Sequence, residues 1–247
     1  MGKTSAKLEV EKGRQVLSHQ ASAQKAPSKG ATTRTLILDT ALRLFNEENA
    51  SDVSTNQIAA DAGISPGNLY YYFRNKEEII RALFPAIRDG IAKPLAYPKD
   101  VPISAEQMAE DYVSAIEVLW RYRFFFADLI GLGQRDADLA QMIQTLQDDT
   151  VAKMADMYDD LAAQGDMDLV DKKTNDLLAL NSFLVWFSWV SFMDRVSDPR
   201  TKREKRLTDG ALACLAIVDP YLKPSYRTAV HEALDDLIHR RQKAKRR

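Results

Sequence analysis

Apolar residues recur every three to four positions along almost the whole sequence, and this spacing limits the fold more than any other feature. From residue 33 or 34 to residue 48 they line one face of a predicted helix: Ile37, Leu38, Ala41, Leu44 and Phe45. Asn49 follows, a residue type that tolerates the left-handed conformation at a helix end. Neither a period-two alternation nor an internal repeat is convincing. The sequence therefore predicts an all-α protein.

Two short helices are predicted directly after this one. Ser54 or Thr55 can cap a helix over residues 56–61, and Gly63 supplies the turn after it. Ser65 can then cap a second helix, which opens with a proline at a position where its missing N–H costs nothing. Two short helices joined by a tight glycine-containing turn form the arrangement that enters the major groove of DNA.

The second short helix has few residues that could anchor it in a core. Only Leu69 and Phe73 suit that role, so its N-terminus and three tyrosines are left for an outside partner. Asn75 followed by Glu78 predicts the start of a fourth helix. Within that helix, Pro85 cannot donate the usual backbone hydrogen bond and clashes with the carbonyl of the preceding turn, which predicts a kink or a break.

Charge is unevenly distributed along the chain. The sequence has 34 lysines and arginines against 35 acidic residues, and a net charge of -1 argues against a nucleic-acid partner. Basic residues nevertheless gather within residues 1–30, and residues 240–247 contain no acid. Both ends can equally be solvated, disordered tails, so their charge alone does not indicate DNA binding.

The motif itself resembles a known family. The stretch 34–83, and especially IAADAGISPGNLYYYFRNKEE over residues 58–78, closely resembles the N-terminal domain of tetracycline-repressor (TetR) family regulators. The resemblance implies a helix-turn-helix that binds duplex DNA as a homodimer, on a palindromic operator, in a bacterial cytoplasmic repressor. It implies DNA contacts by ten residues, namely Thr55, Asn56, Ser65, Pro66, Gly67, Asn68, Tyr70, Tyr71, Tyr72 and Lys76.

The resemblance also implies different roles for these residues. Tyr71, Tyr72 and Lys76 match phosphate contacts, although Tyr72 stands where the family often has histidine. Gly67 offers no side chain, so Asn68 is the expected base reader, because an asparagine amide pairs well with adenine.

The predicted organisation has four parts. A basic tail covers residues 1–30, a helix-turn-helix domain 31–93, an effector-binding and dimerisation domain 94–241, and a second basic tail 242–247. Pro94, Pro98 and Pro102 mark the loop between the two domains. Beyond it we expect helices over residues 104–122, 124–132, 136–163, 169–195, 202–218 and 225–241.

The larger domain is rich in aromatic residues that could enclose an effector. The candidates for effector binding are Trp120, Phe124, Asp128, Asn181, Phe183, Trp186 and Trp189. Because polar anchors are scarce among them, they predict a small hydrophobic effector. An aromatic stripe at helical spacing is, however, more often plain core. If an effector does bind there, the helix with Pro85 is the expected lever to the DNA.

Residues 177–193 form the most apolar stretch. It is shorter than the roughly 20 residues that span a membrane and is bounded by Asp176 and Asp194, so a helix buried on all sides is predicted. Small residues over 210–216 would let another helix approach closely. A dimeric four-helix bundle would cover both segments; the alternative is a monomeric core with the C-terminal helix as a lid.

Enzyme chemistry has little support. The three histidines show no metal-ligand spacing, and no phosphate-binding loop or pair of nucleophile and base is present. Cys214 lies in an apolar run and is predicted to be a core residue. Neither a cofactor nor a metal is expected, and no apolar stretch near the start indicates a signal peptide. The alternative function is an effector-independent architectural or assembly protein that binds DNA with the same fold.

Overall fold

The computed structural model describes residues 29–99, 101–169, 171–196 and 203–244. The chain divides into two compact units, residues 1–36 and 37–247, and the packing contacts that follow lie within the second. Most of the first predicted basic tail, including His19, and half of the second lie outside the described residues.

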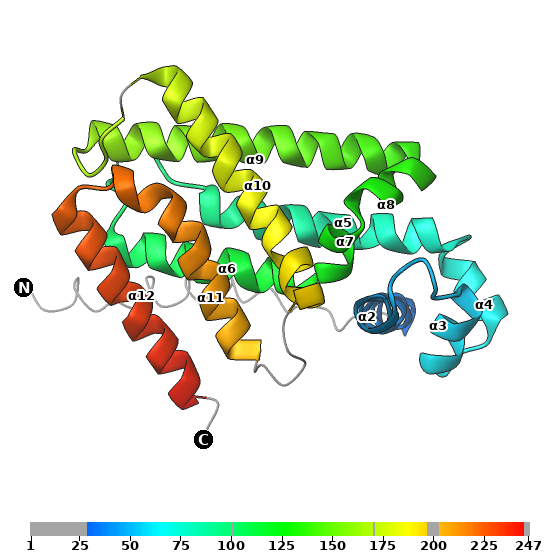
Figure 1. Cartoon of the computed structure of the whole chain (residues 1–247). Helices are drawn as coiled ribbons and strands as arrows, with labels where there is room; N and C mark the ends of the chain where they lie inside the picture. Colours follow the sequence, from blue (N-terminus) through cyan, green and yellow to red (C-terminus); the bar gives the residue numbers. More distant parts are fainter. Residues whose placement is uncertain (1–28, 100, 170, 197–202, 245–247) are drawn as a thin grey trace, which may run out of the picture. The chain divides into compact units, whose positions relative to one another are not determined.

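Helices account for nearly all of the described chain (Figure 1), which confirms the all-α prediction. Outside them the described residues pair only in an isolated bridge, Met167 with Leu222. The elements are α2 (Lys29–Glu48), α3 (Thr55–Asp61), α4 (Pro66–Tyr72), α5 (Lys76–Ala92), η1 (Lys93–Leu95), α6 (Ala105–Arg121), α7 (Arg123–Ala127), α8 (Leu129–Arg135), α9 (Ala137–Ala163), α10 (Lys172–Val196), α11 (Arg203–Val218), η2 (Asp219–Tyr221) and α12 (Pro224–Ala244).

Two predicted helix boundaries differ from the structure. The first helix begins at Lys29, about one turn earlier than predicted, because a helix can begin before the first residue of its apolar stripe. The predicted helix over 124–132 is two helices, α7 and α8, which meet at Asp128. The backbone of Asp128 leaves the helical region, and its carboxylate folds back over Gly131.

Of the kink or break predicted at Pro85, the break is wrong, because α5 continues as one helix from Lys76 to Ala92. Pro85 is exposed, so the missing backbone hydrogen bond lies on the side where water can satisfy the free carbonyl. Leu83, Phe84 and Ile87 are buried on the opposite side and hold both halves of the helix against one core.

The helices after α5 pack around one continuous core. Helix α10 crosses the long helix α9, while α6 packs against α11 and α12 (Figure 1). Buried side chains run without interruption from Ile37 on α2 to Leu234 on α12. The head that contains α3 and α4 and the bundle beyond α5 therefore share a core.

Within one chain, helix α10 is buried on one side only, so the predicted cover on its remaining faces would have to come from a partner. On its inner side Ser182 accepts a hydrogen bond from the hydroxyl of Tyr158 at 2.8 Å, and Asn175 donates to the carbonyl of Ala155 at 3.1 Å. Its outer side exposes a stripe of large apolar residues, which we call the α10 stripe: Leu177, Leu180, Leu184 and Phe192. By length and composition alone, Lys172–Met193 could cross a membrane, a property that core helices of soluble proteins share.

Helix α11 confirms two smaller expectations. Cys214 is fully buried, and burial raises the pKa of its thiol far above the ordinary value, as fits a core residue. Gly210 does allow a close approach, since a Cβ there would lie 2.5 Å from Nε1 of Trp189. The approaching helix is α10 of the same chain.

Candidate DNA interface and effector cavity

Helices α3 and α4 each begin with the predicted serine cap. Ser54 Oγ accepts a hydrogen bond from the backbone N–H of Gln57 at 3.1 Å, and Ser65 Oγ accepts one from that of Asn68 at 3.2 Å. Each serine satisfies a donor that the first helical turn leaves unpaired, typically worth about 1 kcal/mol. These caps fix where both helices of the motif start.

The turn between them depends on Gly63. Its φ of 66° is left-handed, its N–H donates to the carbonyl of Ala60, and the next N–H, of Ile64, donates to Ala59. This pair of bonds closes the end of α3 in the pattern known as a Schellman motif.

Replacing Gly63 with alanine should therefore destabilise the head by about 1 kcal/mol, because a Cβ is strained in the left-handed region. No atom lies within 4 Å of the added Cβ, so the cost is conformational and not steric. Urea unfolding would measure it, with Gly67→Ala in the helical α4 as the control. An unchanged midpoint for Gly63→Ala would contradict this account of the turn.

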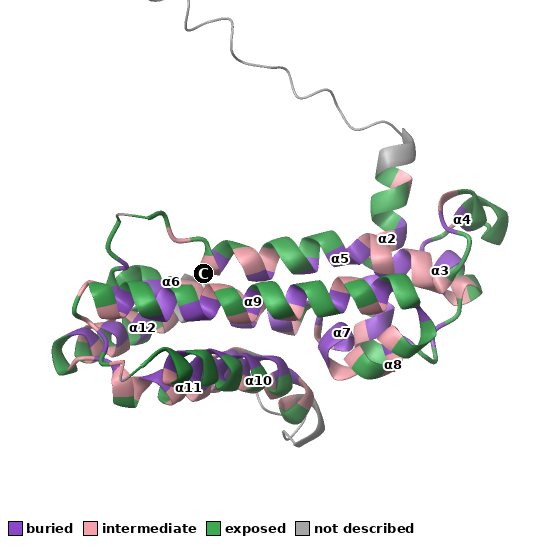
Figure 2. Ribbon diagram, turned by 90° about the horizontal axis from the view of Figure 1, so that it is seen from above, coloured by how far each residue is buried: buried purple, intermediate pink, exposed green. Residues whose placement is uncertain are grey.

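Helix α4 presents one face to the core and the rest outward. Leu69 and Phe73 are buried, which confirms both predicted anchors, whereas residues 65–68 are all exposed. Tyr71 is 81% exposed, and α4 is mostly coloured as exposed in Figure 2. The outward surface, residues 65–68 with Tyr71, is called the α4 face below.

Tyr70 and Tyr72 are held more firmly than Tyr71. The hydroxyl of Tyr70 lies 3.0 Å from Oγ1 of Thr55, which ties α4 to the start of α3. Tyr72 is half-buried against the core, and its ring meets that of Tyr71 edge-on with the centroids 5.0 Å apart. Tyr70 therefore holds α4 against α3, and Tyr72 supports the exposed Tyr71.

Lys76 is more enclosed than a surface lysine. Its ammonium donates to the backbone carbonyls of Ser51 at 2.9 Å and Val53 at 3.0 Å, so it holds the loop before α3. Burial is the largest influence on the Lys76 pKa and lowers it. Two of its three protons are engaged, which leaves one for a phosphate.

The start of α5 is capped in both directions. Asn75 Oδ1 accepts from the N–H of Glu78 at 2.9 Å, and the Glu78 carboxylate accepts from the N–H of Arg74 at 2.7 Å. The cap predicted from Asn75 and Glu78 is thus present. It places Arg74, which is exposed, immediately after α4. Sequence reasoning missed Arg74, although its position beside the tyrosines and its charge were visible.

Asn46, near the end of α2, joins the head to the bundle. Its side-chain amide donates to the carbonyl of Arg121 at 2.8 Å and accepts from the N–H of Phe124 at 3.1 Å. Arg123 in turn donates to the Asn46 carbonyl at 2.8 Å. Beside these bonds the rings of Phe45 and Phe124 pack at 5.1 Å, so the two parts are joined by specific contacts.

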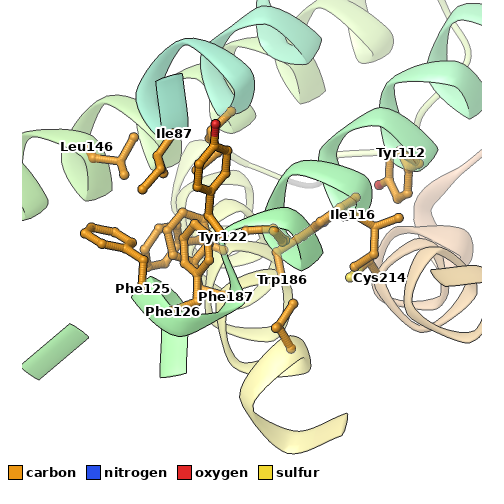
Figure 3. Packing of buried hydrophobic residues seen from close by; sticks show 14 of the residues in the cluster. Ile87, Tyr112, Ile116, Tyr122, Phe125, Phe126, Leu146, Trp186, Phe187 and Cys214 are labelled. Atoms are coloured by element: carbon orange, nitrogen blue, oxygen red, sulfur yellow. The ribbon is translucent and has the colours of Figure 1, made fainter. Parts of the chain in front are cut away.

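A chain of aromatic rings continues from this joint into the bundle. Phe125 lies 5.8 Å from Phe84 of α5 and 5.3 Å from Phe126, and Phe126 lies 5.1 Å from Phe187 of α10. Phe125, Phe126 and Phe187 lie close together in Figure 3. These four residues, Phe84, Phe125, Phe126 and Phe187, are called the aromatic path.

The aromatic path ends at an apolar cavity inside the bundle. The cavity has a volume of about 40 Å³ and draws its walls from α5, η1, α6, α9 and α10. Its lining includes Ile91, Asp111, Tyr112, Trp186 and Phe187. Since a water molecule occupies about 30 Å³ and a drug-sized ligand needs roughly 300 to 1,000 Å³, an effector could enter only if the walls move apart.

Comparison with known proteins decides the family. Residues 37–83 match "Bacterial regulatory proteins, tetR family", and residues 88–230, more than half of the chain, match the TetR description "Bacterial transcriptional repressor". The chain belongs to the TetR family. This is a family of transcriptional regulators and not of enzymes, in agreement with the sequence analysis.

Individual TetR-family relatives support the same conclusion. The chain is 28% identical over 112 residues to the HTH-type transcriptional regulator UidR of Escherichia coli K12, covering 45% of this chain and only 57% of UidR. A solved TetR-family regulator from Marinobacter aquaeolei VT8 is 33% identical, with a TM-score of 0.75 over 83% of this chain and 98% of that one. AibR in complex with isovaleryl coenzyme A and operator DNA shares the fold, with 16% identity and a TM-score of 0.57 over 77% of this chain and all of AibR.

The structure brings the predicted DNA-binding residues of this TetR-family chain to one end of the molecule, on α3, α4 and the start of α5. The predicted effector residues are not brought together. Trp186 lines the cavity, whereas Asn181 is exposed and Asp128 pairs with Arg135 at 2.5 Å. The others have separate surroundings: Trp120 lies under Arg123 and Arg206, Phe124 packs on Phe45, Phe183 stacks on Phe187 and Trp189 packs near Gly210.

Sequence reasoning missed most of the cavity lining. Asp111 carried a usable signal, because it falls between Met108 and Tyr112 on the inward stripe of α6, where an acidic residue is unusual. Tyr97 carried no such sequence signal, since it lies in the loop after η1.

Proposed function

We propose that the chain is a cytoplasmic repressor that binds a palindromic operator as a homodimer and is released by a small molecule. The observation that carries this proposal is the α4 face, which leaves Asn68 and Tyr71 exposed on a capped and tightly packed helix-turn-helix. A helix in this position can enter the major groove with its side chains toward the base edges.

Asn68 and Tyr71 should have separable effects on DNA binding. Asn68→Ala should change which bases are preferred, whereas Tyr71→Ala should weaken binding to all sequences, because base contacts specify and phosphate contacts position. A lost base contact typically costs about 1 to 3 kcal/mol at one position. Binding to a randomised DNA pool, followed by sequencing, would measure both. An unchanged preference for folded Asn68→Ala would remove its assignment as the base reader.

The α10 stripe supports dimerisation. Four large apolar side chains on one outer helix face are a surface that a soluble protein normally covers with a partner. Helix α11 adds Leu212, which is also partly exposed. Two copies joined there would form the expected four-helix bundle and present two α4 faces, which should meet half-sites about 34 to 36 Å apart or a multiple of that.

Helix α5 supports an effector response. Lys76 at its start belongs to the head, while Ile91 near its end lines the cavity, so one continuous helix joins the two sites. An effector that displaces Ile91 or Phe187 as it fills the cavity would transmit this movement to the head, through α5 or the aromatic path. The two α4 faces would then lose the spacing that matches the operator half-sites. The coupling free energy between effector and operator binding would be roughly 1 to 3 kcal/mol.

The small cavity favours one alternative, an architectural protein that binds DNA without an effector. Selecting bound sequences from random DNA, then repeating operator binding with a panel of small molecules, tests both functions. Selective binding that a ligand weakens supports the repressor. Selective binding that no ligand changes supports the architectural protein, and the absence of any sequence preference would contradict the proposal of a specific operator.

A further inference from the structure

Two hollows in the bundle share one wall. The inner one is the cavity described above, and the outer one is a surface hollow of about 390 Å³ between the loop after η1 and the start of α6. Pro94, Tyr97 and Asp111 line both hollows. These three residues therefore separate the outer hollow from the cavity.

Asp111 brings a carboxylate to this wall without a cation beside it. Its two oxygens accept hydrogen bonds from the hydroxyl of Tyr97 at 2.7 Å and from the side-chain amide of Gln107 at 3.0 Å. Both donors are neutral, and none of the residues described as lining the inner cavity is basic. Lys93 lines the outer hollow but is not among the groups that shift the pKa of Asp111. Burial raises the pKa of Asp111, because water is displaced from around the carboxylate with no opposite charge in its place.

The rest of the inner wall also suits a cation. Tyr112 and Trp186 meet there with their ring centroids 5.0 Å apart, and Met154 and Met157 line the same space. Aromatic faces attract cations through their quadrupoles, and methionine sulfur is polarisable and adapts to irregular shapes. A neutral apolar ligand would fit these walls as well, but it would leave the Asp111 carboxylate uncompensated.

We propose that the effector is an organic cation with an apolar body, whose charged group pairs with Asp111 and whose body lies beside Tyr112 and Trp186. The inference rests on the proposed effector response and narrows the chemical class of the ligand. Outward rotation of Tyr97 would free one oxygen of Asp111 and merge the outer hollow with the inner cavity. The merged space would be of the size that small ligands require.

Calorimetric titration of the full chain with two probes of the same shape tests the class of ligand. Phenyltrimethylammonium carries a positive charge, and tert-butylbenzene is its neutral counterpart. The cation should bind about tenfold more tightly or better, and Asp111→Asn should remove that preference while leaving the neutral probe unaffected. Glu110→Gln, on the same helix but exposed, removes the same charge and should keep the preference.

Tyr97→Phe provides a second variant that retains the carboxylate. It removes the hydroxyl that competes for Asp111, so the preference for the cation should persist or increase. Equal affinity for the two probes, no binding of the cation at millimolar concentration, or a preference that survives in folded Asp111→Asn would each overturn the proposal. Operator binding is measured with and without the cation. A cation that binds through Asp111 yet leaves operator affinity unchanged would contradict the proposed release and leave the cation site standing.

Discussion

Leu184→Glu is expected to convert the protein from a dimer to a monomer and to weaken operator binding by roughly 10² to 10⁴-fold. Leu184 is 50% exposed near the middle of the α10 stripe, where a partner helix would cover it. A glutamate there would have to be buried against apolar side chains or keep the two copies apart, and burial of an unpaired charge costs far more than a side-chain contact returns. Each monomer would then bind its half-site independently, without the gain in affinity that comes from joining two heads in one dimer.

Ile130→Glu is the matched control for this change. Ile130 is 78% exposed on α8 and lies outside the α10 stripe, so the same substitution should leave both assembly and operator affinity unaltered. Sedimentation at micromolar concentration measures assembly, and fluorescence anisotropy with a labelled operator measures affinity. A dimeric Leu184→Glu with full affinity would contradict the dimer surface, as would wild-type protein that binds a single half-site as a monomer with full affinity.

The helices could be predicted closely because their ends carry local chemical signals. The side chains of Ser65 and Asn75 each cap a helix by accepting a hydrogen bond from the N–H three residues later. Gly63 closes the end of a helix through a backbone conformation that suits glycine. Such signals depend on neighbouring residues and are visible in one sequence. The division of the predicted helix at Asp128 was not visible in the sequence, because it depends on how the Asp128 carboxylate folds back.

The cavity could not be predicted in the same way. Its walls come from five elements that are far apart in the chain, and aromatic content alone does not distinguish a packed core from a lined space. Trp120 and Phe183 therefore resembled ligand contacts while Asp111 and Tyr97 did not. The outer face of α10 was hidden for a related reason. A helix that is apolar both toward its own core and toward a partner shows no contrast between its faces, and Leu184 looks like any core leucine.

The four rings of the aromatic path predict how effector and operator sites are joined. Phe125 is its central member and is fully buried, in contact with Phe84 on the head side and Phe126 on the cavity side. Its removal should have two consequences, one for stability and one for communication. Leu215, also fully buried but on α11, lies off the path and serves as the control.

Phe125→Ala should lower the free energy of unfolding by about 3 to 5 kcal/mol, because it removes a whole ring from a core that relaxes only in part. In the wild type, operator DNA should slow amide hydrogen exchange around the cavity in α10. In folded Phe125→Ala this slowing should be absent, because the ring that links Phe84 to Phe126 is lost. Leu215→Ala should cost about 2 to 5 kcal/mol and keep that response. Urea unfolding measures the first effect, and exchange with and without selected operator measures the second. If Phe125→Ala kept the exchange response, α5 alone would carry the coupling.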